Sequence, residues 1–242
     1  MKKRVFISGG TGTVGRALVS LFSKAKYEVL FQYHSNTIEA GRLAKETGAQ
    51  CIPIDFSKDP CPPLERIDVL INNAAVNSSR LLTAEVSIPN WNEHLSINLT
   101  WPFLFVKACL PYMMENRWGR IINISSIYGL RACEGNLPYN VSKHGLSALT
   151  KTVAKEYGNF GISSNEICPG PIDSELLTRI AQYHAKEEAS SIEDYLSSLK
   201  EDIPIGRLAT AEDIAEVALF LASDRSGYIN GISCPVDGGL IA

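Results

Sequence analysis

The sequence predicts an α/β fold in which a parallel β-sheet is covered by helices on both faces. Strand-like and helix-like segments alternate along the 242 residues, and such alternation requires right-handed crossovers between parallel strands. Hydrophobic residues make up 45% of the chain and charged residues 20%, which is ordinary globular composition. The length suits one domain, so we expect a single domain over residues 1–242.

The first half of the chain is expected to supply four strands. Apolar residues that include Val14, Leu18 and Phe22 recur at helical spacing directly after the first apolar run. A proline-rich connection separates the third strand from the fourth. The strands are expected at residues 3–8, 27–33, 50–55 and 67–71, with helices at 14–25 and 37–47.

The second half is expected to begin with a long helix over residues 90–116, which should bend or break near Pro102 and Pro111. Further helices are expected at 139–158, where Gly158 is a stop signal, and at 210–222, where Thr210 is a start signal. Strands are expected at 120–125, 162–168 and 228–236. The polar, helix-prone segment 175–200 resembles an insertion over the core, so we expect a lid at about residues 174–203.

Charge and composition exclude several functional classes. The net charge of −3 gives no bulk basic field for nucleic acid or an anionic membrane, and no apolar run approaches the roughly 20 residues of a bilayer span. The basic start of the chain precedes too short an apolar run for a signal peptide, so a cytoplasmic location is expected. The six cysteines are widely spaced, which favours free thiols and predicts no metal site.

A glycine cluster follows the first strand. Residues 10–15 read GTGTVG and match the pattern G-x-G-x-x-G between a strand and a helix, a context typical of dinucleotide binding. Glycines let the backbone approach a pyrophosphate, and the helix N-terminus presents N–H groups to it. The residues expected to hold the cofactor here are Gly9, Thr11, Gly12, Thr13, Val14 and Gly15.

The end of the second strand indicates which dinucleotide is bound. This segment, Tyr33, His34, Ser35 and Asn36, contains no carboxylate for the ribose 2′-hydroxyl of NAD and no arginine for a 2′-phosphate. The last three residues can donate hydrogen bonds to a 2′-phosphate, and Arg42 follows on the next helix. NADP(H) is therefore favoured over NAD(H).

Tyr139 and Lys143 are four residues apart on an expected helix, so they share one face. A neighbouring ammonium lowers the pKa of a phenol, which could then exchange a proton with a carbonyl or an alcohol. Ser126 follows an expected strand, where ligands of parallel sheets gather. Asn98 is polar in an apolar stretch. The alternatives are an ordinary surface Tyr–Lys pair and a capping or kink-stabilising amide at position 98.

Together these motifs resemble the classical short-chain dehydrogenase/reductase superfamily. The resemblance runs from Lys3 to Gly239, and its motifs occur in the family's order. It implies a Rossmann-type, doubly wound, seven-stranded sheet and a homotetramer or homodimer, with a tetramer built on the long helix pair and the C-terminal strand. The motifs are the glycine cluster, Asp55, the NNAA segment 72–75, Asn98, Ser126, Tyr139 with Lys143, and Pro169 with Gly170.

The resemblance also implies roles for these residues. Tyr139 would be the general acid–base, Lys143 would lower its pKa and hold the nicotinamide ribose, and Ser126 would polarise the substrate oxygen. Asn98 would order a water molecule that links Lys143 to solvent. Asp55 would face the adenine, and the backbone of Ile172 would meet the carboxamide. The other implied cofactor contacts are Phe56, Asn73, Ala74, Ala75, Pro169, Gly170 and Ser174.

The sequence departs from the family pattern at three positions. Ser8 and Thr13 replace a threonine and a glycine of the first motif, and Ala75 replaces a glycine. The C-terminal segments are similar to those of 3-oxoacyl-[acyl-carrier-protein] reductases, although the expected lid is longer than theirs.

We therefore expect an NADP-dependent reductase of a small-molecule ketone, with a 3-oxoacyl thioester of acyl-carrier protein or CoA as one candidate substrate. One alternative is a dehydrogenase of a sugar, polyol, cyclic diol or hydroxysteroid. Another is a non-catalytic dinucleotide-binding scaffold or sensor, because a fold alone does not establish a function.

Overall fold

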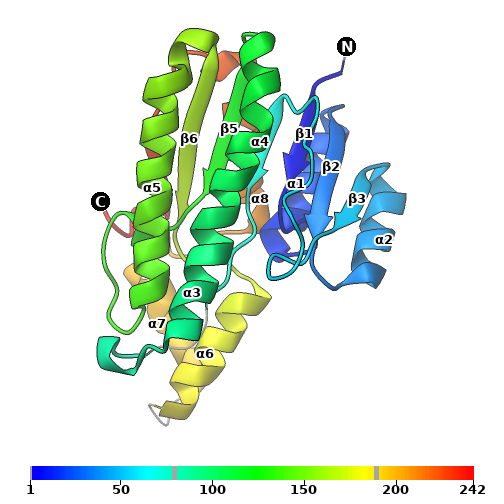
Figure 1. The fold of residues 1–242 in the computed structure, drawn as a ribbon. Helices are drawn as coiled ribbons and strands as arrows, with labels where there is room; N and C mark the ends of the chain where they lie inside the picture. Colours follow the sequence, from blue (N-terminus) through cyan, green and yellow to red (C-terminus); the bar gives the residue numbers. More distant parts are fainter. Residues whose placement is uncertain (1, 78–80, 188–190) are drawn as a thin grey trace.

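Seven parallel strands form one sheet in the computed structural model, which describes residues 2–77, 81–187 and 191–242 (Figure 1). The strand order β3-β2-β1-β4-β5-β6-β7 confirms the expected single-domain, doubly wound α/β fold. The strands are β1 (Arg4–Ile7), β2 (Glu28–Tyr33), β3 (Gln50–Pro53), β4 (Val69–Asn72), β5 (Gly119–Ile124), β6 (Ile162–Pro169) and β7 (Ser233–Val236).

Helices cover both faces of the sheet (Figure 1). One face carries α1 (Thr13–Lys24), α2 (Thr37–Thr47) and α8 (Ala211–Leu221), and the other carries α3 (Ile88–Leu95), α4 (Trp101–Glu115) and α5 (Leu137–Tyr157). Each face has its own apolar cluster, because a parallel sheet must bury both sides.

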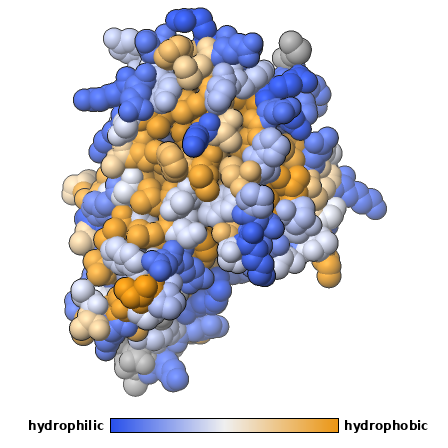
Figure 2. All heavy atoms as spheres, viewed as in Figure 1, coloured by the Kyte–Doolittle hydropathy of each residue, from blue (hydrophilic) through white to orange (hydrophobic). Residues whose placement is uncertain are grey.

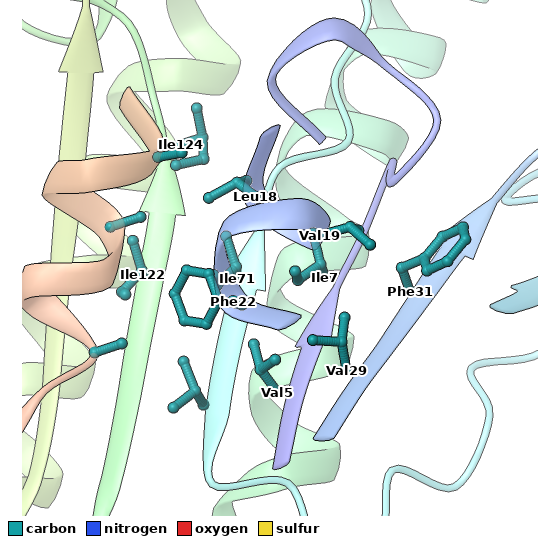
Figure 3. Close-up of a cluster of buried hydrophobic side chains, with 14 of the residues drawn as sticks. Val5, Ile7, Leu18, Val19, Phe22, Val29, Phe31, Ile71, Ile122 and Ile124 are labelled. Carbon is teal, nitrogen blue, oxygen red and sulfur yellow. The ribbon is translucent and has the colours of Figure 1, made fainter. Parts of the chain in front are cut away.

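The cluster under α1 fixes the start of the chain against the centre of the sheet. Leu18 and Phe22 of α1 lie over strand residues such as Val5, Ile7 and Ile71, as Figure 3 shows. All five side chains are fully buried. Complete burial of one such side chain contributes about 1.5–3 kcal/mol, so this packing holds the β1–α1 turn firmly.

The prediction of one long helix over residues 90–116 is wrong in one respect. A π-helical turn at Ser96–Thr100 separates α3 from α4. Pro102 lies in the first turn of α4, where a proline has no intrahelical hydrogen bond to break. Pro111 lies inside α4 and does not end it. The interruption therefore comes just before the first proline rather than at both.

The expected helix-prone segment 175–200 forms two helices, α6 (Glu175–Glu187) and α7 (Ile192–Asp202), and residues 188–190 of the expected lid lie outside the described residues. Ser191 begins α7 through a capping box with Asp194. The rings of His184 and Tyr195 stack at 4.5 Å and join the two helices. Figure 1 shows both helices projecting beyond the sheet at the carboxyl ends of the strands.

The last strand is shorter than the expected span 228–236, because only Ser233–Val236 pairs with β6. Gly231 has φ of 77°, and the side chain of Asn230 accepts a hydrogen bond from the backbone N–H of Ser164, so the preceding residues form a turn instead. None of the described helices combines the length and apolarity needed to cross a membrane. The six cysteines form no disulfide, with Cys109 and Cys168 buried and the other four half-buried.

Candidate active site

A cleft of about 1370 Å³ lies at the carboxyl ends of the strands, roofed on one side by α6 and α7. Ligands of doubly wound sheets bind at this edge. The cleft brings together most of the residues that the sequence predicts. Those that line it are Gly9, Thr11, Gly12, Thr13, Val14, Gly15, His34, Asp55, Phe56, Asn73, Ala74, Ala75, Ser126, Tyr139, Lys143, Pro169, Gly170, Ile172 and Ser174.

The glycine loop forms a tight turn that leaves the start of α1 facing the cleft. Gly9 has φ of 67°, and a Cβ on Gly15 would lie only 2.1 Å from the backbone oxygen of Gly9. Gly12 is the N-cap of α1 and has no side chain to accept the first N–H groups of the helix. Backbone donors and a positive helix end at a cleft fit a pyrophosphate, so this cradle fits a dinucleotide.

Two side chains from neighbouring strands hold this loop in place. Gln32 of β2 accepts a hydrogen bond from the Gly9 N–H at 2.8 Å and donates to the Ile54 carbonyl at 2.9 Å. The hydroxyl of Ser8 accepts from the N–H groups of Asn73 and Ala74, each at 3.0 Å. The serine that departs from the family motif therefore still ties the ends of β1 and β4 together. Gln32 was not among the predicted site residues, although a polar residue within an apolar strand could have indicated it.

The end of the cleft that the residues after β2 and β3 line, called the distal end here, carries charged and titratable side chains. Nε2 of His34 lies 3.7 Å from the carboxylate of Asp55, and Nζ of Lys58 lies 3.0 Å from it. Hydrogen bonds from Ser57 and then from Lys58 hold the pKa of Asp55 well below its ordinary value. Lys58 also lines the cleft, and the sequence analysis missed this cation.

Several residues of the expected cofactor segment do not line the cleft. The Tyr33 side chain packs in the apolar core, because strand alternation turns it away from the site. Ser35 lies outside the lining, and the Asn36 side chain caps α2 by accepting from the Glu39 N–H at 3.2 Å. Arg42 is held at the surface by Glu39 and Glu46. Of the segment Tyr33 to Asn36, His34 lines the cleft and the other three residues do not.

The start of α5 and the end of β5 bring Tyr139, Lys143 and Ser126 together. Tyr139 lies in the first turn of α5, and Lys143 follows one turn later, with its Nζ 5.5 Å from the tyrosine ring centroid. Ser126 begins a short 3₁₀ turn after β5, and its hydroxyl accepts from the Tyr128 N–H at 3.1 Å. The ammonium of Lys143 donates to the Ile124 carbonyl at 2.9 Å.

The proton affinities in this cluster differ from the sequence-based expectation. Burial raises the pKa of the Tyr139 phenol to about 12, against an opposing hydrogen bond with Ser126. Burial lowers the pKa of Lys143 to about 8, against the opposing influence of Cys168 and Glu166. The net shift is therefore upward rather than downward, because desolvation outweighs the hydrogen bond from Ser126. The phenol is neutral and the ammonium is largely charged at pH 7.

Asn98 lies behind the cleft rather than in its lining. In the π-helical turn, its amide accepts from the Val76 N–H at 2.8 Å and donates to the Val76 carbonyl at 2.9 Å and the Ser142 hydroxyl at 3.0 Å. The structure thus shows Asn98 tying this turn to α5 and to the chain after β4. This placement matches the alternative of a kink-stabilising amide, because Asn98 lies within the π-helical turn between α3 and α4.

Helices α6 and α7 line one end of the cleft with apolar and aromatic side chains, together with Glu175, Arg179 and His184, and the sequence did not indicate any of these residues as part of the site. Leu176, Leu177 and Ile180 come from α6, and Tyr183 and Tyr195 face the same space from α6 and α7. Their signal was the helical spacing of apolar residues in a polar segment. The lid therefore contributes a hydrophobic wall.

Comparisons with known proteins agree with this geometry. The family model described as Enoyl-(Acyl carrier protein) reductase matches residues 62–241. Acetoacetyl-CoA reductase of Shinella zoogloeoides is 31% identical, over 99% of this chain and 98% of that protein. Glucose 1-dehydrogenase 2 of Bacillus subtilis is 30% identical, over 98% and 94%. Relatives of similar identity thus carry names with different substrates.

Solved structures are similar over the whole chain. An oxidoreductase of the short chain dehydrogenase/reductase family from Burkholderia thailandensis is 29% identical, with a TM-score of 0.85, over 100% of this chain and 93% of that one. ElxO with NADP bound is 28% identical, with a TM-score of 0.86, over 100% and 99%.

Proposed function

Because this chain belongs to the short-chain dehydrogenase/reductase superfamily and is an oxidoreductase of C=O and CH–OH groups, we propose that it reduces an apolar ketone with NADPH. The observation that carries this proposal is a neutral phenol, a serine hydroxyl and an ammonium gathered at one cleft. A phenol whose pKa is about 12 holds its proton at pH 7, as an acid that protonates a carbonyl oxygen must.

The chain's own residues supply the proton chemistry. Tyr139 would donate its proton to the substrate oxygen, and Ser126 would donate a hydrogen bond to the same atom, which favours the negative charge that develops there. Lys143 would stabilise the phenolate that remains, because its ammonium lies beside the ring. Asn98 would act through the π-helical turn that it fixes rather than by contact with the substrate.

The loop and the strand ends would hold the cofactor, which supplies the hydride when bound. The N-terminus of α1 and the glycine turn suit its pyrophosphate. The lining residues Asp55 and Phe56 suit the adenine end. Asn73 with its two following alanines, and Ile172 with its neighbours in the lining, suit the middle and the nicotinamide end.

The distal charges favour NADPH over NADH. His34 and Lys58 present donors where a 2′-phosphate would lie, and β2 ends without a carboxylate for a ribose hydroxyl. The similar ElxO structure also contains NADP. We therefore propose NADP(H) as the working cofactor.

The substitution His34→Asp tests this preference. The new carboxylate repels a 2′-phosphate and accepts from a ribose hydroxyl, so the ratio of NADPH to NADH affinity should fall by about tenfold or more, which corresponds to 1.4 kcal/mol. Fluorescence titration with NADPH and with NADH measures this ratio. Contacts that the two cofactors share affect both affinities equally, so they do not change the ratio. An unchanged ratio, or parent protein that binds NADH tenfold more tightly, would contradict the assignment.

The apolar side chains that α6 and α7 present to the cleft favour an apolar substrate. Leu176, Ile180 and Tyr183 would contact an acyl chain or ring through dispersion and hydrophobic burial, which a polyhydroxylated sugar cannot match. A 3-oxoacyl thioester is the specific candidate, since a relative named as an acetoacetyl-CoA reductase covers nearly the whole chain.

A substrate panel tests the function directly. The purified protein with NADPH should reduce acetoacetyl-CoA, and a longer 3-oxoacyl-CoA should give a higher kcat/KM because its chain meets the apolar wall. D-glucose with NADP⁺ is the matched probe for the alternative named by the Bacillus subtilis relative. Faster glucose oxidation than ketone reduction would replace the proposal with that alternative.

We also propose that copies of the chain assemble through the α4–α5 face and β7 as a homotetramer or homodimer. Figure 2 shows apolar residues gathered on the face that carries α4 and α5. Phe103 of α4 is 46% exposed, and Leu104 and Ala108 of α4 and Leu149 of α5 are half-buried. The mass in solution by light scattering tests this assembly, and a monomer at micromolar concentration would refute it.

A further inference from the structure

Glu166 is a carboxyl group in the middle of the buried strand β6, and its side chain has no exposed surface. Burial of a charge is costly unless the group is paired and hydrogen-bonded. The Oε2 atom accepts from the Ser147 hydroxyl of α5 at 2.9 Å, and Oε1 accepts from the Ser233 hydroxyl of β7 at 2.5 Å. Two hydroxyl donors, one on each oxygen, suit a carboxylate.

Glu166 belongs to a polar row that crosses the sheet beneath α5. Asn72, Asn123, Glu166 and Ser233 are in register on β4, β5, β6 and β7, so their side chains share one face. Asn72 donates to Asn123 at 2.8 Å, and Asn123 donates to the Thr150 hydroxyl of α5 at 2.8 Å. The row therefore joins α5 directly to β5 and β6, and through them to β4 and β7.

The same row reaches the proposed catalytic lysine through α5. Ser147 lies one turn after Lys143, and its hydroxyl lies 3.3 Å from the backbone carbonyl oxygen of Lys143 as well as 2.9 Å from Glu166, so Glu166 lies beside the turn of α5 that carries the lysine. Lys143 is only 2% exposed, and its ammonium has the neutral Ile124 carbonyl as a hydrogen-bond partner. A buried ammonium of this kind needs an anion nearby to remain charged.

Glu166 is the group that can supply this anion. Two titratable groups interact electrostatically with Glu166: Lys143 on α5 and Cys168 on β6. Cys234 is the titratable residue of β7, and β5 presents the neutral Asn123 at this register. The other titratable residues of α5 are Tyr139, His144, Lys151, Lys155, Glu156 and Tyr157. Burial raises the pKa of the Cys168 thiol to about 12 and raises that of Cys234. Both thiols therefore hold their protons near pH 8, and the influence of Cys168 on Lys143 acts only at a higher pH, where that thiol ionises.

We propose that Glu166 is a positioning residue that keeps Lys143 protonated and holds α5 in place beneath the cleft. The inference rests on the proposed function for the importance of Lys143, but the coupling of the two charges can be measured without substrate. Loss of the negative charge disfavours the protonated lysine, so the pKa of Lys143 should fall from its value near 8.

The test is an NMR titration of protein labelled at lysine Cε, with Lys143 assigned by the signal lost in Lys143→Met. The substitution Glu166→Gln should lower the Lys143 midpoint by about one pH unit. The glutamine can donate to one serine hydroxyl and accept from the other, so the fold should persist. The alkaline limb of kcat/KM should move to lower pH by the same amount.

Thr150→Val is the matched control, since it removes a neutral hydrogen bond from the same row and helix and should leave the midpoint unchanged. Glu166→Met, which replaces the charge with an apolar chain of similar length, is the second variant if the glutamine variant does not fold. An unchanged Lys143 midpoint in a folded Glu166 variant would overturn the proposal. A lowered midpoint in a protein that reduces no ketone would support the coupling and refute the proposed function instead.

Discussion

Tyr139→Phe should lower kcat for ketone reduction by about 10²–10⁴-fold, because it removes the proton that the substrate oxygen receives. The ring and its packing are retained, so NADPH affinity should change little. Stopped-flow or steady-state oxidation of NADPH measures the rate, and fluorescence titration measures the affinity. The large loss in kcat without a matching loss of cofactor binding is the signature of a proton donor.

Tyr157→Phe is the matched control for this experiment. Tyr157 lies at the far end of the same helix, with its ring 6.4 Å from that of Phe160, and it does not line the cleft. Removal of the Tyr157 hydroxyl should leave kcat unchanged. Equal rates for the Tyr139→Phe protein and its parent on every ketone would show that this phenol is not the acid.

Gly15→Ala should cause the largest loss of cofactor binding together with a loss of stability. The new Cβ would lie 2.1 Å from the Gly9 oxygen and 2.8 Å from the Gly10 Cα, and these backbone atoms cannot move without opening the turn. Overpacking of this kind costs about 1–3 kcal/mol. The displaced loop would no longer present the start of α1 to the pyrophosphate. Urea denaturation and NADPH titration measure the two losses.

Gly41→Ala is the matched control: it is the same substitution at an open position, and we expect it to stabilise the protein rather than destabilise it. Gly41 lies inside α2, and its added Cβ would meet no atom within 4 Å. Alanine is the better helix former, so the free energy of unfolding should rise by about 0.5–1 kcal/mol with NADPH affinity unchanged. Similar behaviour of the two variants would mean that the tight Gly9–Gly15 contact does not shape the cofactor loop.

The neutral phenol has a consequence for the direction of catalysis. A tyrosine whose pKa is near 12 is protonated at pH 7, so the proton that reduction needs is in place and little phenolate is present to accept a proton from an alcohol. The Lys143 ammonium, with a pKa near 8, loses its charge first as the pH rises. The fall of reductase activity above pH 8 should therefore follow the lysine rather than the tyrosine.

Much of the fold could be predicted because the local signals were strong. The helix over 37–47 begins and ends as predicted, since Asn36 caps its start and Gly48, with φ of 72°, ends it. The glycine turn after β1 was predicted for the same reason, because its residues are required by backbone geometry that does not depend on distant parts of the chain.

Other features depended on contacts that no local pattern contains. Asn98 holds a π-helical turn through Val76, which is distant in sequence, so the sequence predicted an interruption at the prolines but not this turn before them. Arg42 has the right charge for a phosphate, but Glu39 and Glu46 on its own helix hold it at the surface. Glu166 could be noticed in an apolar strand, but its row of partners appears only when four strands align.

The sequence by itself determined the alternating α/β order, the dinucleotide turn and the pairing of Tyr139 with Lys143, because each follows from spacing along one stretch of backbone. The tertiary structure decided how strongly those groups hold their protons and which residues reach the cleft. Burial and the approach of other elements set the energy of a charge, and neither is encoded within a single turn of helix.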